Sequence, residues 1–206
     1  MSWSLSVRAT RNPELVDAVL LAAGKSLYIA NAFEAKCKSV LQIFNLVTAV
    51  EADSIRSLED TLASLPPDRK LHQTIQGILA HEDFGDRASV SEVLGKAREA
   101  RNFIAHEGMN VGLLPELRAV SLAEHAARLR SAVSDLAVGD NLVSTWCYEI
   151  SEREPAPSIR NHYPEMVDGW IFGELDRLLE SVDFSQDREL TIREALQRRK
   201  AASSGS

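Results

Sequence analysis

Apolar residues recur at the spacing of α-helices, three or four positions apart, along nearly the whole chain. The pattern predicts a short helix over residues 13–23, a break at Gly24 and a long helix over residues 26–51. Two further helices are predicted over residues 54–65 and 68–80; two prolines close the former, and Asp68 can cap the latter. The first half of the chain is therefore expected to be a series of helices.

The next predicted helix covers residues 89–107. Ser89 or Ser91 can serve as its N-cap, and Glu92 stands at the capping-box position relative to Ser89. Gly108 is placed to end the helix. Its apolar positions predict one buried face, made of Val90, Val93, Leu94, Ala97, Ala100, Phe103 and Ile104.

Irregular segments and helices alternate in the rest of the chain. Residues 109–120 are expected to form an irregular connection, and residues 121–150 a long helix that is interrupted or bent near Gly139. Residues 154–164 contain three prolines and predict an elbow before an amphipathic helix over residues 165–179.

Together these elements predict an all-α fold, a bundle of about four or five helices with an accessory C-terminal helix. The chain has 206 residues, of which 45% are apolar, enough for one domain with a real core. We expect the bundle to occupy residues 1–150, the elbow and accessory helix residues 151–182, and a frayed or disordered tail residues 183–206.

The location predicted from the sequence is the cytoplasm. We find no apolar run of transmembrane length and no basic-then-apolar layout at the N-terminus, so no membrane partner is expected. Cys37 and Cys147 lie far apart, outside any Cys-x-x-Cys motif, and each is flanked by apolar residues at helical spacing. Both are predicted to be reduced core thiols.

The net charge of −7 is concentrated near the C-terminus. Residues 149–189 contain eleven acidic and four basic residues, so the rest of the chain is balanced. This overall acidity argues against tight, non-specific binding of duplex DNA. It is compatible with a small basic cleft that acts on RNA, because residues 96–101 carry three cations.

The most distinctive chemistry lies in residues 98–107, where Arg101, Asn102 and His106 form the pattern Arg-Asn-x-x-x-His. Arginine is permanently charged and grips phosphate with a fork of N–H groups, while histidine can transfer a proton near neutral pH. A permanent cation, an amide and a proton carrier in an apolar stretch suit chemistry on a phosphodiester.

Geometry leaves several arrangements of this motif open. Five helical residues place Arg101 and His106 about 140° apart around a regular helix, so they would not meet as a surface pair. Either the helix loosens near Gly108, or two copies of the chain bring the side chains together at a two-fold axis. In the structural alternative, Arg101 pairs with Glu99, Glu107 or a carbonyl, and His106 merely caps the helix.

Other chemistry finds little support in the sequence. The histidines have no partners at metal-ligand spacing, so no metal site is predicted. Neither cysteine has a local catalytic partner, and no nucleophile elbow or glycine-rich phosphate loop is present. We therefore expect no cofactor.

The segment 94–107, which reads Leu-Gly-Lys-Ala-Arg-Glu-Ala-Arg-Asn-Phe-Ile-Ala-His-Glu, resembles the signature of the HEPN superfamily of helical bundle domains. That signature is an arginine, a polar residue, three further residues and a histidine. Residues 32–36 and 40–44 also resemble the first long helix of these domains. The similarity covers about residues 26–150 in helix order, and only the short motif is specific.

The resemblance implies a metal-independent endoribonuclease, often a toxin or phage-defence protein, that works as a dimer with facing motifs. His106 would be the general base or acid for attack of the ribose 2′-OH on phosphate, Arg101 would stabilise phosphoryl charge, and Asn102 would orient groups. RNA would then be the substrate, because the attack needs the 2′-OH. A separate antitoxin or other protein partner is also implied.

Two other functions compete with the ribonuclease. One is a catalytically silent HEPN-like module that binds RNA or a protein. The other is a regulatory helical protein in which the motif is structural. Retention of Arg101, Asn102 and His106 together favours the enzyme, since a silent module has no chemical need for all three.

Overall fold

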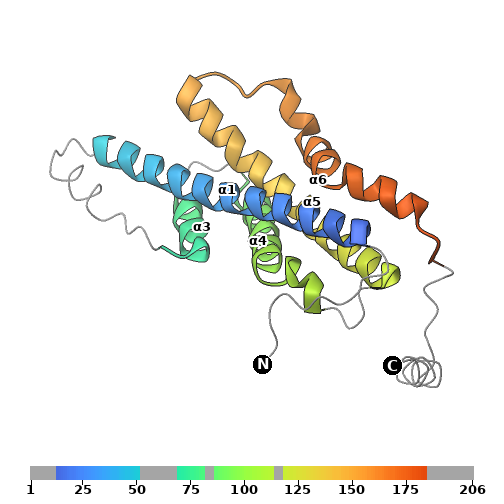
Figure 1. The fold of residues 1–206 in the computed structure, drawn as a ribbon. Coiled ribbons are helices and arrows are strands. Elements are labelled where there is room, and N and C mark those ends of the chain that lie inside the picture. Colours follow the sequence, from blue (N-terminus) through green and yellow to red (C-terminus); the bar gives the residue numbers. More distant parts are fainter. Residues whose placement is uncertain (1–12, 52–68, 82–85, 114–117, 185–206) are drawn as a thin grey trace, which may run out of the picture.

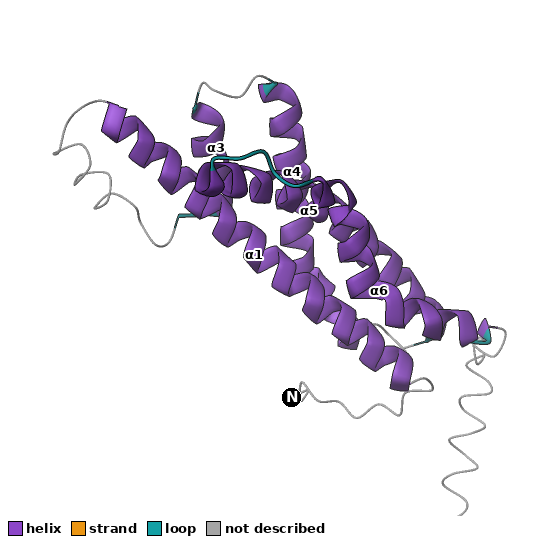
Figure 2. Ribbon diagram, turned by 90° about the horizontal axis from the view of Figure 1, so that it is seen from above, coloured by secondary structure: helices purple, strands orange, loops and turns teal. Residues whose placement is uncertain are grey.

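The computed structural model describes residues 13–51, 69–81, 86–113 and 118–184. Every regular element in these ranges is helical, so the predicted all-α class is confirmed (Figure 2). The helix predicted over residues 54–65, the cap at Asp68 and most of the predicted tail lie outside the described residues. The elements are α1 (Pro13–Glu51), α3 (Leu71–Ala80), α4 (Arg87–Phe103), a π-helix (Ile104–Gly108), a 3-10 turn (Asn110–Leu113), α5 (Ala119–Glu152), a 3-10 turn (Ser158–His162) and α6 (Tyr163–Ser181).

Helix α1 is the spine of the molecule. It packs against α5 and α6 on one side and against α3 on another (Figure 1). The predicted break at Gly24 is wrong, because the apolar positions before and after it are in phase and form one buried stripe. Burying that stripe outweighs the cost of about 1 kcal/mol for a glycine inside a helix. The stripe includes Val19, Ala22, Ala23, Ala30, Phe33 and Val40.

Because the helices predicted over residues 13–23 and 26–51 form one element, α1 is a long and largely apolar helix. Residues Pro13–Val50 are long and apolar enough to cross a membrane, judged by length and composition only. The expectation that no such run exists is therefore wrong. In this structure the buried residues of α1 belong to the core that it shares with α5 and α6, as in the core helix of a folded domain.

Helix α5 runs without interruption through Gly139, so the predicted interruption there is wrong. Gly139 lies where α4 crosses α5: a Cβ atom built on it would be 2.3 Å from the Cβ of Ala97 and 3.5 Å from Cε2 of Phe33. The glycine therefore permits close approach of two backbones over a ring of α1.

Helix α4 begins one turn earlier than predicted. Its N-cap is Asp86, whose side chain accepts a hydrogen bond from the backbone N–H of Ser89 at 3.2 Å. Neither Ser89 nor Ser91 caps the helix, and both lie within its first two turns. An aspartate is as good a cap as a serine, which is why sequence alone did not separate these starts.

Helix α6 packs on both α1 and α5. Its buried residues Val167, Ile171, Phe172 and Leu175 belong to the same core cluster as those of the other helices. The guanidinium of Arg130 lies 4.5 Å from the ring centre of Phe172 and binds two carboxylates of α6. The helix predicted over residues 165–179 is thus confirmed, with slightly wider bounds.

A polar network inside the core joins α1, α5 and α6. The buried carboxylate of Asp140 accepts hydrogen bonds from the Lys36 ammonium at 2.9 Å and from the Tyr163 hydroxyl. Lys36 also donates to the hydroxyl of Ser144 at 2.9 Å. Burial and the adjacent Asp140 raise the pKa of Tyr163, so its hydroxyl stays a donor at neutral pH.

The crossing at Gly139 can be tested by adding one methyl group. We expect Gly139→Ala to lower the free energy of unfolding by about 1–3 kcal/mol, because the helices must separate to admit the Cβ. Gly169→Ala, at a helical position with open space around it, is the control and should be neutral or stabilising by up to about 1 kcal/mol. Urea unfolding followed by circular dichroism measures both. Equal effects would contradict the close approach.

Candidate functional site: a basic pocket beside the motif

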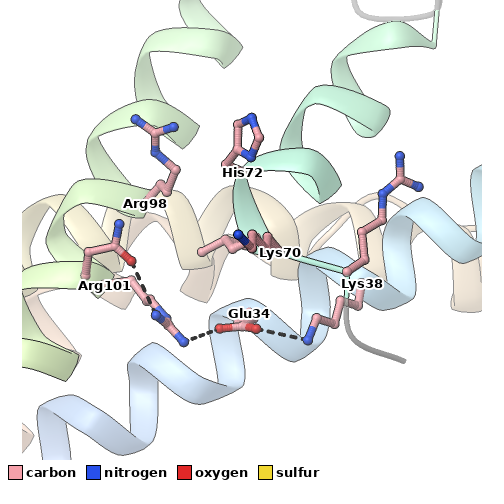
Figure 3. Close-up of a pocket in the computed structure, with 9 residues that line it drawn as sticks. Glu34, Lys38, Lys70, His72, Arg98 and Arg101 are labelled. Carbon is pink, nitrogen blue, oxygen red and sulfur yellow. Dashed lines mark hydrogen bonds and ion pairs between the residues drawn. The ribbon is translucent and has the colours of Figure 1, made fainter. Parts of the chain in front are cut away.

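A cavity of about 530 Å³ opens between α1, α4 and the start of α3 (Figure 3). We call it the basic pocket, because five permanent cations and one carboxylate line it in a chain of net charge −7. Its lining residues are Glu34, Lys38, Arg69, Lys70, Leu71, His72, Arg98, Arg101 and Asn102.

Helix α4 supplies one wall of the basic pocket. Arg98, Arg101 and Asn102 are spaced i, i+3 and i+4, which places them on one helical face. Leu94, one turn before Arg98, and Ala97, directly before it, are fully buried in the core. The packing of α4 therefore turns two of the three motif residues toward the cavity.

Glu34 lies between two of the cations. Its carboxylate accepts from the Arg101 guanidinium and pairs with the Lys38 ammonium at 2.9 Å (Figure 3). Burial by itself would raise the pKa of Glu34, but the hydrogen bond from Lys38 and the charge of Arg101 lower it overall. Glu34 is consequently ionised at neutral pH and partly neutralises Arg101.

The pocket also contains unused hydrogen-bond donors. In the part of the chain that the structure describes, the Nε–H groups of Arg98 and Arg101 are buried without a hydrogen-bond partner. A buried N–H without a partner costs free energy. The guanidinium of Arg101 otherwise binds Glu34 and, at 3.3 Å, the side-chain oxygen of Asn102.

The N-terminus of α3 forms the opposite wall. Lys70 is the N-cap residue, its side chain makes no capping bond, and Leu71 and His72 are the first residues of the helix. Backbone N–H groups at a helix start carry partial positive charge and favour anions. Arg69 and Lys70 add two full charges at the same end.

The third motif residue lies elsewhere. His106 is exposed and does not line the basic pocket with Arg101 and Asn102. It belongs to the π-helix Ile104–Gly108 that continues α4, so the chain winds differently between Arg101 and His106 than a regular helix would. Gly108 ends this segment as predicted, and the side chain of Asn110 donates to the carbonyl of His106 at 2.9 Å.

A buried histidine holds the end of the π-helix. Nε2 of His125 lies 2.9 Å from the carbonyl oxygen of Gly108. Because a carbonyl only accepts, Nε2 carries the proton, and Nδ1 accepts from Arg128 at 3.5 Å. The ring therefore fixes the segment that presents His106.

Sequence reasoning missed most of the basic pocket. Glu34 and Lys38 have the i, i+4 spacing of an ion pair, and Arg69-Lys-Leu-His72 is a basic run before a helix. Both signals are common on solvated surfaces, so only the packing of α1, α3 and α4 reveals that they converge. No three His, Cys, Asp or Glu side chains gather to form a metal site within the described ranges.

Cys37 and Cys147, both predicted to be reduced core thiols, are free thiols. Cys37 is fully buried in α1, and burial raises its pKa far above the ordinary range. Cys147 is only partly buried. Neither thiol lines the basic pocket.

Comparison with protein-family models, with curated proteins and with solved structures finds no match to this chain.

The role of His125 can be tested by removing its donor. We expect His125→Leu to lower the free energy of unfolding by about 1–3 kcal/mol, since the buried Gly108 carbonyl loses its partner. His125→Gln retains an N–H donor and should lose less. Urea unfolding gives the stability, and hydrogen exchange over residues 104–110 reports the local effect. Equal losses in the two variants would show that ring volume matters and the hydrogen bond does not.

Proposed function

We propose that this protein is a metal-independent endoribonuclease of the HEPN type. The single observation that supports this best is that Arg101 and Asn102 of the motif open onto a cavity lined by five cations. Such a cavity suits a phosphodiester, whose charge is delocalised over oxygens that arginine binds in a fork. The π-helix carrying His106 adds support, since such segments are frequent at functional sites.

In this proposal the 2′-oxygen of a ribose attacks the adjacent phosphorus, and the bond from phosphorus to the 5′-oxygen breaks. His106 serves as general base for the 2′-OH proton or as general acid for the leaving oxygen. Arg101 stabilises the charge that develops on the phosphoryl oxygens, and Asn102 orients its guanidinium. The products are a 2′,3′-cyclic phosphate and a 5′-OH, and no redox partner or cofactor is consumed.

We further propose that the active form is a homodimer with the motif at or near the interface. Within one chain, His106 lies outside the cavity that holds Arg101. A two-fold arrangement would let His106 of one subunit act at the cavity of the other. A cytoplasmic toxin or phage-defence effector with a protein antitoxin is the biological setting that the HEPN resemblance suggests.

A second candidate is a catalytically silent module that binds RNA or a protein. Two observations favour it. Arg101, the cation that catalysis would need, is already paired with Glu34, and His106 does not line the cavity. The two candidates share a binding surface and differ only in whether the motif performs chemistry.

Cleavage assays separate these candidates. We expect wild-type protein to cleave single-stranded RNA in the presence of EDTA and to leave 2′,3′-cyclic phosphate ends. Arg101→Ala and His106→Ala should each reduce the rate by at least about 100-fold, because each removes a group that acts in the transition state.

Arg177→Ala and His162→Ala are matched controls, since both residues are exposed and distant in sequence from the motif. Circular dichroism and sedimentation should show unchanged helicity and subunit number in all four variants. Absence of EDTA-resistant cleavage from the wild type, with harmless expression, would eliminate the enzyme and leave the binding module.

A further inference from the structure

We propose that the basic pocket holds one nucleotide of a single-stranded RNA next to the scissile bond. Arg69, Lys70 and Arg98 would bind the neighbouring phosphate, and His72 would stack on the base. This inference rests on the proposed function and extends it, because none of these four residues belongs to the motif.

The charge balance of the pocket favours a multiply charged anion as ligand. Glu34 pairs with Arg101 and Lys38, which leaves Arg69, Lys70 and Arg98 without a carboxylate from among the lining residues. Outside the lining residues, Arg98 forms an ion pair at 3.6 Å with Glu99, which is exposed, so solvent weakens the pair. Cations concentrated in one cavity repel each other unless an anion enters.

Two arginines of α4 give the pocket more than one point at which phosphate can bind. The Nε–H of Arg98 and that of Arg101 are both buried and, among the described residues, unpaired. They lie three residues apart on α4, and the N-terminus of α3 lies across the cavity from Arg98 (Figure 3). Two donor groups at separate points of one cavity suit two successive phosphates better than a single small anion.

The shape of the cavity favours a single strand. A volume of about 530 Å³ is within the range of sites that enclose one small-molecule-sized group. A nucleotide splayed from a flexible strand can enter such a recess, whereas a stacked duplex cannot. The imidazole of His72 is exposed at the start of α3, which offers a ring for a base to stack on.

Glu34 would then act as a placeholder for phosphate. Its carboxylate occupies the guanidinium of Arg101, so an entering phosphate must displace it. Removing the charge of Glu34 should therefore strengthen RNA binding, whereas removing a cation from the far wall should weaken it. This arrangement therefore predicts that the two kinds of substitution change RNA affinity in opposite directions.

The test measures binding without cleavage. The probe is a fluorescent 2′-O-methyl oligonucleotide, which lacks the attacking hydroxyl, and its anisotropy is followed against KCl concentration with the full chain. Arg69→Ala and Lys70→Ala should each weaken binding about tenfold and reduce the slope of log affinity against log salt by about 0.7, the value for one phosphate contact on a single strand. Glu34→Gln should bind more tightly, and His72→Ala more weakly with the slope unchanged.

Lys96→Ala and Arg177→Ala remove one charge each outside the pocket lining and should change neither quantity. The proposal is overturned if pocket and control variants bind alike, if the duplex form of the probe binds as tightly as the single strand, or if adenosine monophosphate competes as well as the oligonucleotide. Because the probe cannot be cleaved, a protein that shows this binding pattern but no nuclease activity would retain the pocket and lose only the proposed catalysis.

Discussion

The close crossing of α4 and α5 at Gly139 is the constraint on which the rest of the structure depends. The backbones approach until Gly139 faces the Cβ of Ala97, with the ring of Phe33 beneath them. Helix α4 has little freedom to rotate about its axis once Ala97 is seated there. This also fixes the direction of Arg98, Arg101 and Asn102, which follow Ala97 by one, four and five residues and line the basic pocket.

One short stretch of α1 contacts the helix crossing, the basic pocket and the polar network that joins α5 to α6. Phe33 contacts the crossing, Glu34 binds Arg101, and Lys36 reaches the buried Asp140, the residue that follows Gly139 in α5. Asp140 in turn accepts from Tyr163 at the start of α6. A buried carboxylate left without its cation costs about 3–5 kcal/mol, so this ion pair selects one register of α1 against α5. That register also sets the position of Glu34 in the basic pocket.

The helical class was predictable because apolar residues recur at helical spacing along the chain, most sharply in α3 and α4. Predictions failed at two glycines that were taken as helix breaks. Gly24 lies inside α1 and Gly139 inside α5, since burial of a continuous stripe at the first and close backbone approach at the second override helix propensity. Arg101, Asn102 and His106 were found from their spacing. The remaining pocket residues could not be found, because three segments that lie far apart in the sequence meet only when the helices pack.

The position of His106 carries the strongest constraint on any chemistry at this site. A regular helix would already turn it away from Arg101, and the π-helix does not bring it to the same cavity. Asn110 and His125 hydrogen-bond the backbone carbonyls at the two ends of the segment from His106 to Gly108, and an inward movement of this segment would break these bonds. A proton carrier fixed outside the cavity can act on a bound phosphodiester only if the substrate reaches out to it or a second subunit brings another His106. In the proposed homodimer, the second subunit brings its His106 to the cavity, and the hydrogen bond between His125 and the Gly108 carbonyl stays intact. Catalysis in this arrangement would therefore depend on protein concentration, whereas RNA binding in the basic pocket would not.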